Sequence, residues 1–207
     1  MKITAIEQQK KDKTRYNFFI DGGYVFALYD DTILKYGLRK GDVLDEKQIK
    51  EMREYNEYNY GKRVAYNYLS YRQRSRKEIE RKLKLKKISE RTSEKVIKWL
   101  EGLNYINDEE FAKQVIENKV ARKPIGRKMV ERKLFQSGIE KETIAKVIEE
   151  NYTPEMELEK AEEVLKKYMK KVKYKDEFDR RNKCFKYLVS RGFGYDTTEQ
   201  IINMHCK

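Results

Sequence analysis

Two patterns of apolar and polar positions divide the chain near its first quarter. Aromatic and β-branched residues form short runs at 16–20 and 24–28, and the Asp21-Gly22-Gly23 segment between them is typical of a β-hairpin. Residues 2–9 are a further predicted strand. We therefore predict a small β-rich N-terminal domain over residues 1–55.

From residue 56 onward, apolar residues recur at the three- and four-residue spacing of amphipathic helices. Ile79 and Leu83 are such a pair, and Ser75 with Glu78 forms the S-x-x-E capping box of a helix start. The surrounding stretch, Ser70–Ile88, holds nine Lys or Arg residues against two Glu. We predict a short helix here with one apolar face and one strongly cationic face.

The sequence of this predicted helix recurs later in the chain. RKEIERKL at 76–83 matches RKMVERKL at 127–134 at an offset of 51, with six of eight residues identical. The same offset aligns the turn residues 87–88 with 138–139. A weaker third copy, a further 54 residues on, aligns Leu134 with Leu188 and Gly138 with Gly192. Repetition at this period is typical of stacked helical units.

The predicted fold class is mainly α, with three tandem three-helix repeats of the helix-turn-helix kind that form an elongated, curved body behind the β-rich domain. Short helices bury their apolar faces only by packing within a unit and against neighbouring units. The repeats are expected at 56–108, 109–152 and 153–207. Residues 55–61 are expected to form a hinge before a helix over 62–72.

Positive charge is concentrated around the first repeat. The chain has a net charge of +13, to which residues 60–108 contribute +8 (14 Lys or Arg against 6 Asp or Glu), whereas residues 1–59 are neutral. A concentrated basic surface attracts polyanions. Biased codon usage also enriches Lys, so a merely solvated charged face is the alternative. Codon bias explains arginine less well, and four of the 15 arginines lie between Arg72 and Arg81.

Motifs that would support an enzyme are missing from the sequence. It has no P-loop, no G-x-G-x-x-G run, no Cys/His metal set and no Ser/His/Asp triad. Asp21, Asp30 and Asp31 are conceivable Mg²⁺ ligands, but they occupy turn and cap positions where Asp is expected for local reasons. We therefore expect no enzymatic activity, no metal and no cofactor.

Targeting signals are also missing, which predicts a cytoplasmic protein. No apolar run reaches the length of about 18 residues that spans a membrane, and the N-terminus lacks the apolar core of a signal peptide. Cys184 and Cys206 have no CxxC spacing, which fits a reducing compartment. We expect Cys184 on an apolar helix face, Cys206 in an exposed position and His205 in a frayed tail.

Two kinds of nucleic-acid contact are consistent with these patterns. Three-helix units with a tight turn resemble helix-turn-helix modules, whose cations contact phosphates near a helix N-terminus. Base reading is not predicted, because no Asn, Gln or Arg set has an evident base-reading geometry. The tyrosines between Tyr55 and Tyr71 could stack on bases, but their helical spacing favours packing in a core or hinge.

Together these features resemble the RecX family, bacterial regulators of the RecA recombinase. The resemblance is carried by YLSYRQRSRKEIERKL at Tyr68–Leu83, by LNYINDEEFA at Leu103–Ala112, and by the Gly126…Leu134…Gly138-Ile139 pattern of the second copy. It covers about residues 60–202. The third copy, RNKCFKYL at 181–188, departs from the basic pattern, so its role is less defined.

The resemblance implies a non-enzymatic regulator that lies in the groove of RecA–single-stranded DNA filaments. Such proteins limit filament growth and lower the ATPase, strand-exchange and coprotease activities of RecA in homologous recombination and SOS DNA repair. We expect a monomer that also binds bare single-stranded or double-stranded DNA. The candidate RecA- or DNA-binding residues are Arg72, Arg74, Arg76, Lys77, Arg81, Lys84, Arg122, Arg127, Lys128 and Arg132.

Other interpretations of the same cations stay open. Some of them could pair with Glu80 and Glu131 inside the protein, although exposed pairs of that kind contribute only about 0–1 kcal/mol. The alternative function is a stand-alone helix-turn-helix DNA-binding protein or transcription factor. A third possibility is a protein scaffold whose charges bind nothing.

Overall fold

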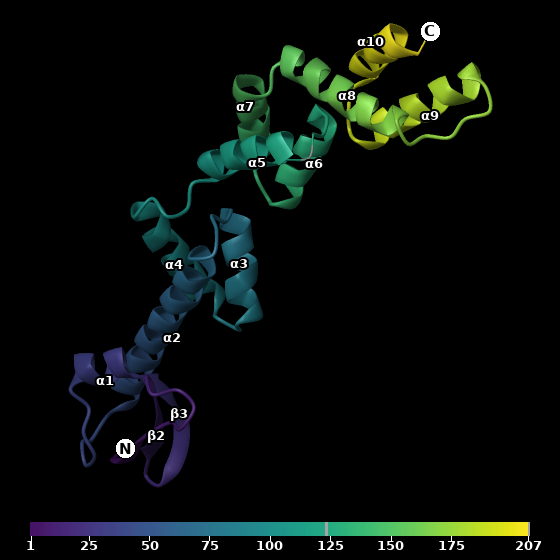
Figure 1. Ribbon diagram of the computed structural model, residues 1–207. Helices are drawn as coiled ribbons and strands as arrows, with labels where there is room; N and C mark the ends of the chain where they lie inside the picture. Colours follow the sequence, from purple (N-terminus) through teal and green to yellow (C-terminus); the bar gives the residue numbers. More distant parts are fainter. Residues whose placement is uncertain (123, 207) are drawn as a thin grey trace. The chain divides into compact units, whose positions relative to one another are not determined.

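The computed structural model describes residues 1–122 and 124–206, without the side chains of residues 119–122. The described residues form three strands and ten helices, which confirms the predicted class of a mainly helical chain with a small N-terminal sheet (Figure 1). Two compact units are present. Unit 1 comprises Met1–Gln73 and Ile79–Tyr105, and unit 2 comprises Arg74–Glu78 and the residues from Ile106 onward.

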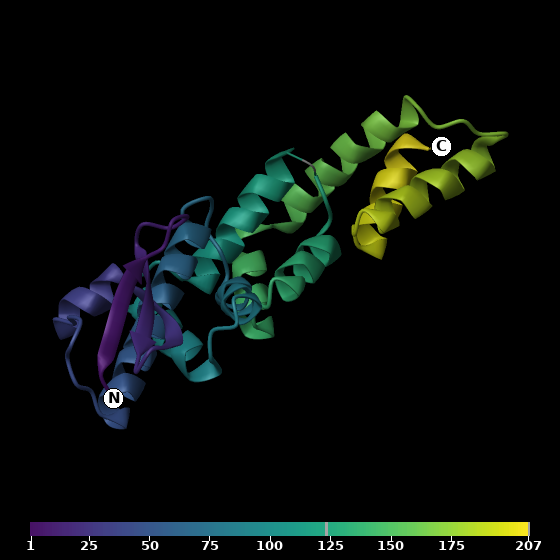
Figure 2. The same cartoon turned by 90° about the horizontal axis from the view of Figure 1, so that it is seen from below.

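Unit 1 begins with a three-stranded antiparallel sheet in the order β1 (Ile3–Gln8), β2 (Arg15–Ile20), β3 (Gly23–Tyr29). The strands lie side by side in Figure 2. Asp21 and Gly22 have positive φ angles of 48° and 82°, as a tight hairpin turn requires. The predicted hairpin is therefore confirmed. A short helix, α1 (Asp30–Tyr36), follows and ends at a left-handed Gly37.

The sheet packs on a long helix, α2 (Glu46–Leu69), which begins at an Asp45 capping box. Phe18 and Leu28 of the sheet form a buried cluster with Met52 of α2. The expected hinge at 55–61 is wrong, because α2 is one continuous helix of 24 residues that includes this segment. Gly61 is needed for packing: a Cβ there would lie 2.9 Å from Val96 Cγ2, so glycine lets α4 (Glu90–Gly102) approach α2 closely.

The remaining helices follow the predicted three-fold pattern. In the first repeat, α2 is followed by α3 (Arg76–Leu85) and α4. The second repeat contains α5 (Asp108–Arg122), α6 (Arg127–Gln136) and α7 (Lys141–Asn151), and the third contains α8 (Pro154–Met169), α9 (Glu177–Ser190) and α10 (Tyr195–His205).

The turn after the middle helix of each repeat has the same geometry. Lys87, Gly138 and Gly192 have left-handed φ angles of 58°, 82° and 86°. In each turn the following residue donates its N–H to the carbonyl five residues back, at 3.2 Å in all three copies. The hydrogen bonds run from Ile88 N to Leu83 O, from Ile139 N to Leu134 O and from Phe193 N to Leu188 O. The repeat alignment made from the sequence is thereby confirmed at the level of individual hydrogen bonds.

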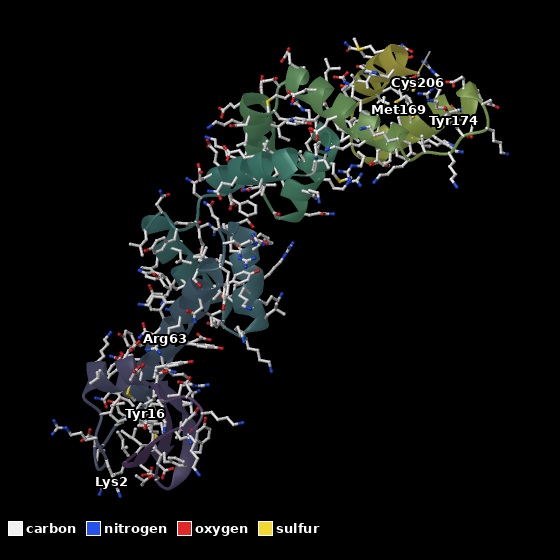
Figure 3. The ribbon with its side chains drawn as sticks, viewed as in Figure 1. Lys2, Tyr16, Arg63, Met169, Tyr174 and Cys206 are labelled. Carbon is white, nitrogen blue, oxygen red and sulfur yellow. The ribbon has the colours of Figure 1, made fainter. Side chains whose placement is uncertain are left out.

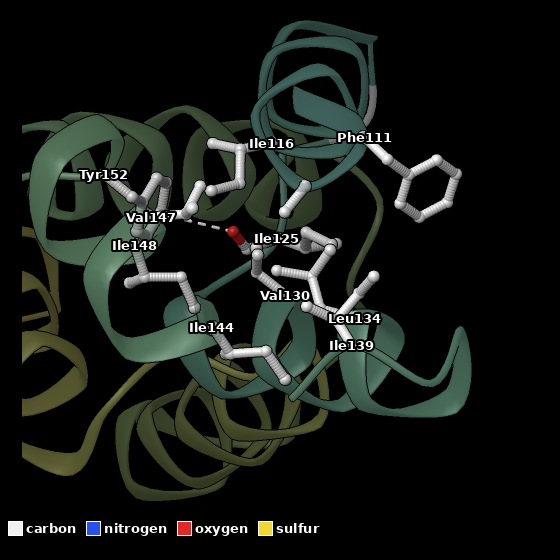
Figure 4. Packing of buried hydrophobic residues seen from close by; sticks show 11 residues of the cluster. Phe111, Ile116, Ile125, Val130, Leu134, Ile139, Ile144, Val147, Ile148 and Tyr152 are labelled. Atoms are coloured by element: carbon white, nitrogen blue, oxygen red, sulfur yellow. Dashed lines mark hydrogen bonds between the residues drawn. The ribbon is translucent and has the colours of Figure 1, made fainter. Parts of the chain in front are cut away.

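Each repeat of unit 2 has its own apolar core. The core of the second repeat gathers residues from α5, α6 and α7 (Figure 4), and Val130 and Leu134 supply its contribution from α6. Tyr152 closes this core and donates from its hydroxyl to the Ile125 carbonyl at 2.8 Å. Burial raises the pKa of the Tyr152 hydroxyl, which keeps it protonated as a donor.

The C-terminal residues pack more closely than expected. Cys184 is fully buried in the core of the third repeat, as predicted, but Cys206 is also buried there, so its expected exposure is wrong. Burial and the neighbouring Cys206 raise the pKa of the Cys184 thiol to about 11. His205 belongs to α10, and its Nε2 lies 2.8 Å from Glu162 Oε1, so it is not in a frayed tail.

Candidate functional site

The helix start beside the most basic stretch has the predicted capping box. Ser75 Oγ accepts a hydrogen bond from Glu78 N at 3.2 Å, and Glu78 Oε2 accepts one from Ser75 N at 3.3 Å. Ser75 is fully buried, and its Oγ also donates to the Ser137 carbonyl at 2.6 Å. The start of α3 is thus fixed against the α6–α7 turn within unit 2.

A carboxylate from the protein itself occupies the N-terminus of each basic helix. The backbone N–H of Arg76, at the start of α3, donates to Asp108 Oδ1 at 2.8 Å. The backbone N–H of Arg127, at the start of α6, donates to Glu157 Oε1 at 3.0 Å. A helix N-terminus favours negative charge. Because internal carboxylates take that position, an external anion near either helix start would meet side chains instead of this backbone N–H.

These two places have corresponding architecture, and we refer to them as the acid-capped joints. The first joint is formed by Arg74–Glu78 with Asp108 and the Ser137-Gly138 turn. The second is formed by Gly126–Lys128 with Glu157 and the Arg191-Gly192 turn. In the second joint Gly126 N donates to Arg191 O at 3.0 Å, and Lys128 N donates to Gly192 O at 3.1 Å.

Glycine makes both joints possible. A Cβ at Gly126 would lie 2.2 Å from Phe193 N, which is backbone that cannot give way. A Cβ at Gly138 would lie 2.4 Å from Lys77 Cβ, so the aliphatic stem of Lys77 packs over that glycine. The joints lie at opposite ends of α6, whose ten residues span about 15 Å.

The predicted cations differ in their surroundings. On α3 and in the segment just before it, the side chains of Arg74 and Arg76 are half-buried. Those of Arg72, Lys77, Arg81 and Lys84 are exposed. Arg72 Nη1 donates to the Gln73 carbonyl at 2.8 Å. On α6, Lys128 and Arg132 are exposed, whereas Arg127 is half-buried and its Nε lies 3.5 Å from Glu131 Oε1. The alternative of pairing with Glu131 inside the protein therefore holds for Arg127. Arg122 was also predicted, but its side chain lies outside the described residues.

The structure thus gathers the predicted cations of unit 2 at two joints. Arg74, Arg76 and Lys77 lie at the first, and Arg127 and Lys128 lie at the second. Arg132 lies further along α6. Arg72, Arg81 and Lys84 belong to unit 1. The repeated cations could be found from their spacing along the sequence. The carboxylate that binds each helix start lies about 30 positions later, so no local sequence signal predicts that pairing.

A second group of polar residues, missed by sequence reasoning, lies where α2 leaves the sheet. Arg63 is labelled in Figure 3. Its Nη2 lies 2.8 Å from both Asp30 Oδ1 and Asp31 Oδ1, and its guanidinium carbon lies 4.7 Å from the centre of the Tyr29 ring. Asp30 and Asp31, weighed above as Mg²⁺ ligands, are therefore partners of an arginine. No group of three or more His, Cys, Asp or Glu residues suited to a metal occurs among the residues that the structure describes.

Comparisons with known families cover most of the chain. The model of the regulatory protein RecX N-terminal domain matches residues 1–45. Models of the first, second and third three-helix domains of RecX match residues 62–100, 107–148 and 155–202. Across the described part of the chain, no helix has the length and apolar character needed to cross a membrane.

Individual relatives agree with the family models. Regulatory protein RecX of Listeria monocytogenes serovar 1/2a is 36% identical over 193 residues, which cover 93% of this chain and 71% of that protein. Regulatory protein RecX of Staphylococcus aureus strain Newman is 31% identical over 202 residues, covering 98% and 74%.

Solved structures are also similar. A crystal structure of regulatory protein RecX matches with a TM-score of 0.68 and 29% identity over 98% of both chains. The crystal structure of RecX from Lactobacillus salivarius matches with a TM-score of 0.66 and 28% identity, over 72% of this chain and 96% of that one.

Proposed function

This chain belongs to the RecX family of regulatory proteins, and from that premise we propose that it regulates the RecA recombinase by binding RecA–single-stranded DNA filaments in the cytoplasm. In this proposal it limits filament growth and lowers the ATPase, strand-exchange and coprotease activities of RecA. It acts as a binding protein without catalytic chemistry of its own.

The observation that carries the proposal is the repetition of the acid-capped joint. The same Arg-Lys pair is presented at Arg76-Lys77 and again at Arg127-Lys128, about 15 Å of helix apart. A filament is a polymer that repeats its acidic groups at regular intervals. Cations that recur in the same setting on one body suit such a partner better than they suit a single small ligand.

The exposed cations supply the electrostatic attraction in this proposal. Lys84, Lys128 and Arg132 are exposed, and within the described part of the chain none of them has a carboxylate at ion-pair distance. They would contact DNA phosphates or acidic side chains of RecA. Each phosphate contact on a single strand makes the logarithm of affinity fall by about 0.7 per decade of salt. Binding to the filament should therefore weaken as salt increases.

A charge-reversal experiment tests the proposal. The triple variant Lys84→Glu, Lys128→Glu, Arg132→Glu changes exposed side chains only, so its fold should be retained. RecA ATPase on single-stranded DNA is measured with wild-type protein, with this variant and with a control of equal charge change in the third repeat, Lys170→Glu, Lys171→Glu, Lys186→Glu. We expect inhibition by the wild type and the control, and loss of inhibition by the triple variant.

The possible outcomes test two statements separately: that the protein regulates RecA, and that these three cations are responsible. Full inhibition by the folded triple variant would contradict the assignment of these cations. No inhibition by the wild type would contradict RecA regulation itself. Salt-dependent binding to duplex DNA without any effect on RecA would instead favour the stand-alone DNA-binding alternative.

A further inference from the structure

An open pocket of about 470 Å³ lies in unit 1, whereas the acid-capped joints belong to unit 2, and it is lined by residues of α1, α2 and α4. Its volume falls within the range of about 300–1,000 Å³ that is usual for ligand sites. Arg63, labelled in Figure 3, is part of its lining. The other lining residues are Asp31, Asn59, Lys62, Tyr66, Asn67 and Trp99.

Most of the lining comes from one face of α2. The positions from Asn59 to Asn67 follow the spacing i, i+3, i+4, i+7 and i+8, which places their side chains on one stripe of the helix. A stripe that serves core packing is apolar. This stripe carries two amides, two cations and a tyrosine that is 54% exposed, so core packing does not explain its composition.

Asn59 is the buried member of this stripe. The residue is only 4% exposed, and its Nδ2 has no hydrogen-bond partner among the described residues. Buried amides are normally satisfied, and an unsatisfied donor destabilises the fold. This nitrogen is itself shielded from solvent, and the residue contributes to the wall of the pocket.

The pocket carries one cation that is not neutralised. Arg63 is balanced by Asp30 and Asp31 at 2.8 Å. Lys62 has no carboxylate at ion-pair distance in the described part of the chain. Its Nζ is held 5.2 Å from the centre of the Trp99 ring and 4.9 Å from that of Tyr58. An ammonium group thus lies directly beside an indole.

An indole, an exposed phenol, two side-chain amides and one ammonium group together match a single chemical class. Aromatic rings stack on nucleobases, amides bond to base edges, and an ammonium group attracts phosphate. We propose that this pocket binds one nucleotide of a single-stranded nucleic acid, with the base against Trp99 and Tyr66 and the phosphate at Lys62. This proposal rests on the proposed function in one respect only: the single strand would be the DNA of the RecA filament.

The chain carries its own reporter for this site, because Trp99 is its single tryptophan. The fluorescence of the full-length protein is titrated with a short oligothymidylate, with an abasic oligomer of equal phosphate number and with thymidine monophosphate. We expect oligothymidylate to change the Trp99 fluorescence in a saturable way, at concentrations where the abasic oligomer leaves the fluorescence unchanged. An equal change with the abasic oligomer would overturn base binding, and an equal change with the monophosphate would overturn a strand as the source.

Variants test the pocket residues directly, using a labelled oligothymidylate and fluorescence anisotropy. Tyr66→Ala should weaken binding about tenfold, in line with the loss of a stacked base, whereas Tyr66→Phe should bind like the wild type. Tyr195→Ala, which removes a tyrosine that is 61% exposed on α10, is the matched control and should have no effect. Lys62→Gln should weaken binding and flatten its salt dependence. Wild-type affinity for the folded Tyr66→Ala variant would overturn the proposal.

RecA ATPase measured in parallel distinguishes this proposal from the proposed function. Inhibition of RecA by a wild-type protein that shows no base-dependent fluorescence change overturns the pocket and leaves the function. A base-dependent change without inhibition of RecA overturns the function and leaves the pocket.

Discussion

The backbone N–H of Arg76 is bound by the carboxylate of Asp108 at 2.8 Å, so the first residue of α5 closes the N-terminus of α3. The same relationship holds between Arg127 and Glu157. Each carboxylate satisfies a donor that a helix leaves unpaired and lies at the positive end of the helix dipole. The acid-capped joints are therefore both packing contacts and electrostatic contacts.

Removal of a capping carboxylate should destabilise unit 2, and more so at the second joint. Gly126 provides no side-chain cap for α6, whereas Ser75 also caps α3. We expect Glu157→Ala to lower the free energy of unfolding by about 1–2 kcal/mol and Asp108→Ala to have a smaller effect. Urea unfolding followed by circular dichroism measures both. Glu159→Ala, on the same helix but 69% exposed at its side chain, is the control, and equal stability of the two glutamate variants would argue against the cap.

Close backbone contact at the second joint should make Gly126 intolerant of any side chain. A Cβ at Gly126 would lie 2.2 Å from Phe193 N and 2.3 Å from the carbonyl of Gly192. We expect Gly126→Ala to lower the free energy of unfolding by about 1–3 kcal/mol through overpacking. Gly102→Ala is a matched control, because nothing lies within 4 Å of its added Cβ. Thermal unfolding compares the two, and the contact is refuted if both variants unfold like the wild type.

Glu57 should make the stability of unit 1 depend on acid pH. Burial alone raises the pKa of Glu57, but hydrogen bonds from Thr92 Oγ1 at 2.5 Å, Ser89 Oγ at 2.7 Å and Ser89 N at 2.9 Å outweigh it and hold the pKa below its usual value. A lowered folded-state pKa means that the stabilisation is complete above the unfolded value of about 4.3 and is lost as pH falls through the folded value.

The variant Glu57→Gln tests this pH dependence. At neutral pH it should be less stable than the wild type by about 1–3 kcal/mol, because it loses hydrogen bonds to a charged acceptor. The difference should shrink as the pH falls below about 4.3. Urea unfolding at neutral and acid pH measures it, with the exposed Glu94→Gln as control. A difference that stays constant with pH would exclude this role of the carboxylate.

Local patterns predicted the repeat because its determinants are close in sequence. Each middle helix places two apolar residues four positions apart and ends in a left-handed turn, and these features recur at Lys87, Gly138 and Gly192. Lys87 shows that the turn does not require glycine, because the first repeat has the same left-handed backbone conformation, with φ 58°, at a lysine. Apolar spacing, more than residue identity, defined the unit.

Contacts between distant residues explain what sequence reasoning missed. The expected hinge at 55–61 ended at Gly61, but that glycine allows the close approach of Val96 from α4, and the helix runs through it. The acid caps join Arg76 to Asp108 and Arg127 to Glu157, which no local spacing signals.

The α2 stripe from Asn59 to Asn67 was missed for a different reason. The tyrosines at helical spacing predicted core or hinge packing, and the polar residues between them carry no motif of their own. Tyr66 is in fact exposed beside these residues. The cations of α3 and α6 were found from composition, but their surroundings could be known only from the fold.

Because α2 is continuous, it fixes both the rotation and the distance between the sheet and α4 along the helix axis. Met52 on this helix packs against the sheet, and nine positions later Gly61 meets α4. One residue inserted between them would turn the sheet by about 100° around the helix axis and separate Arg63 from Asp30 and Asp31, which are held on the sheet side. Seven inserted residues would restore the angle to within about 20°, but they would move the sheet about 10 Å along the axis, so Arg63 would lose Asp30 and Asp31 in that case too. The direction in which the sheet faces therefore depends on insertion length in turns, whereas the ion pairs of Arg63 tolerate neither insertion.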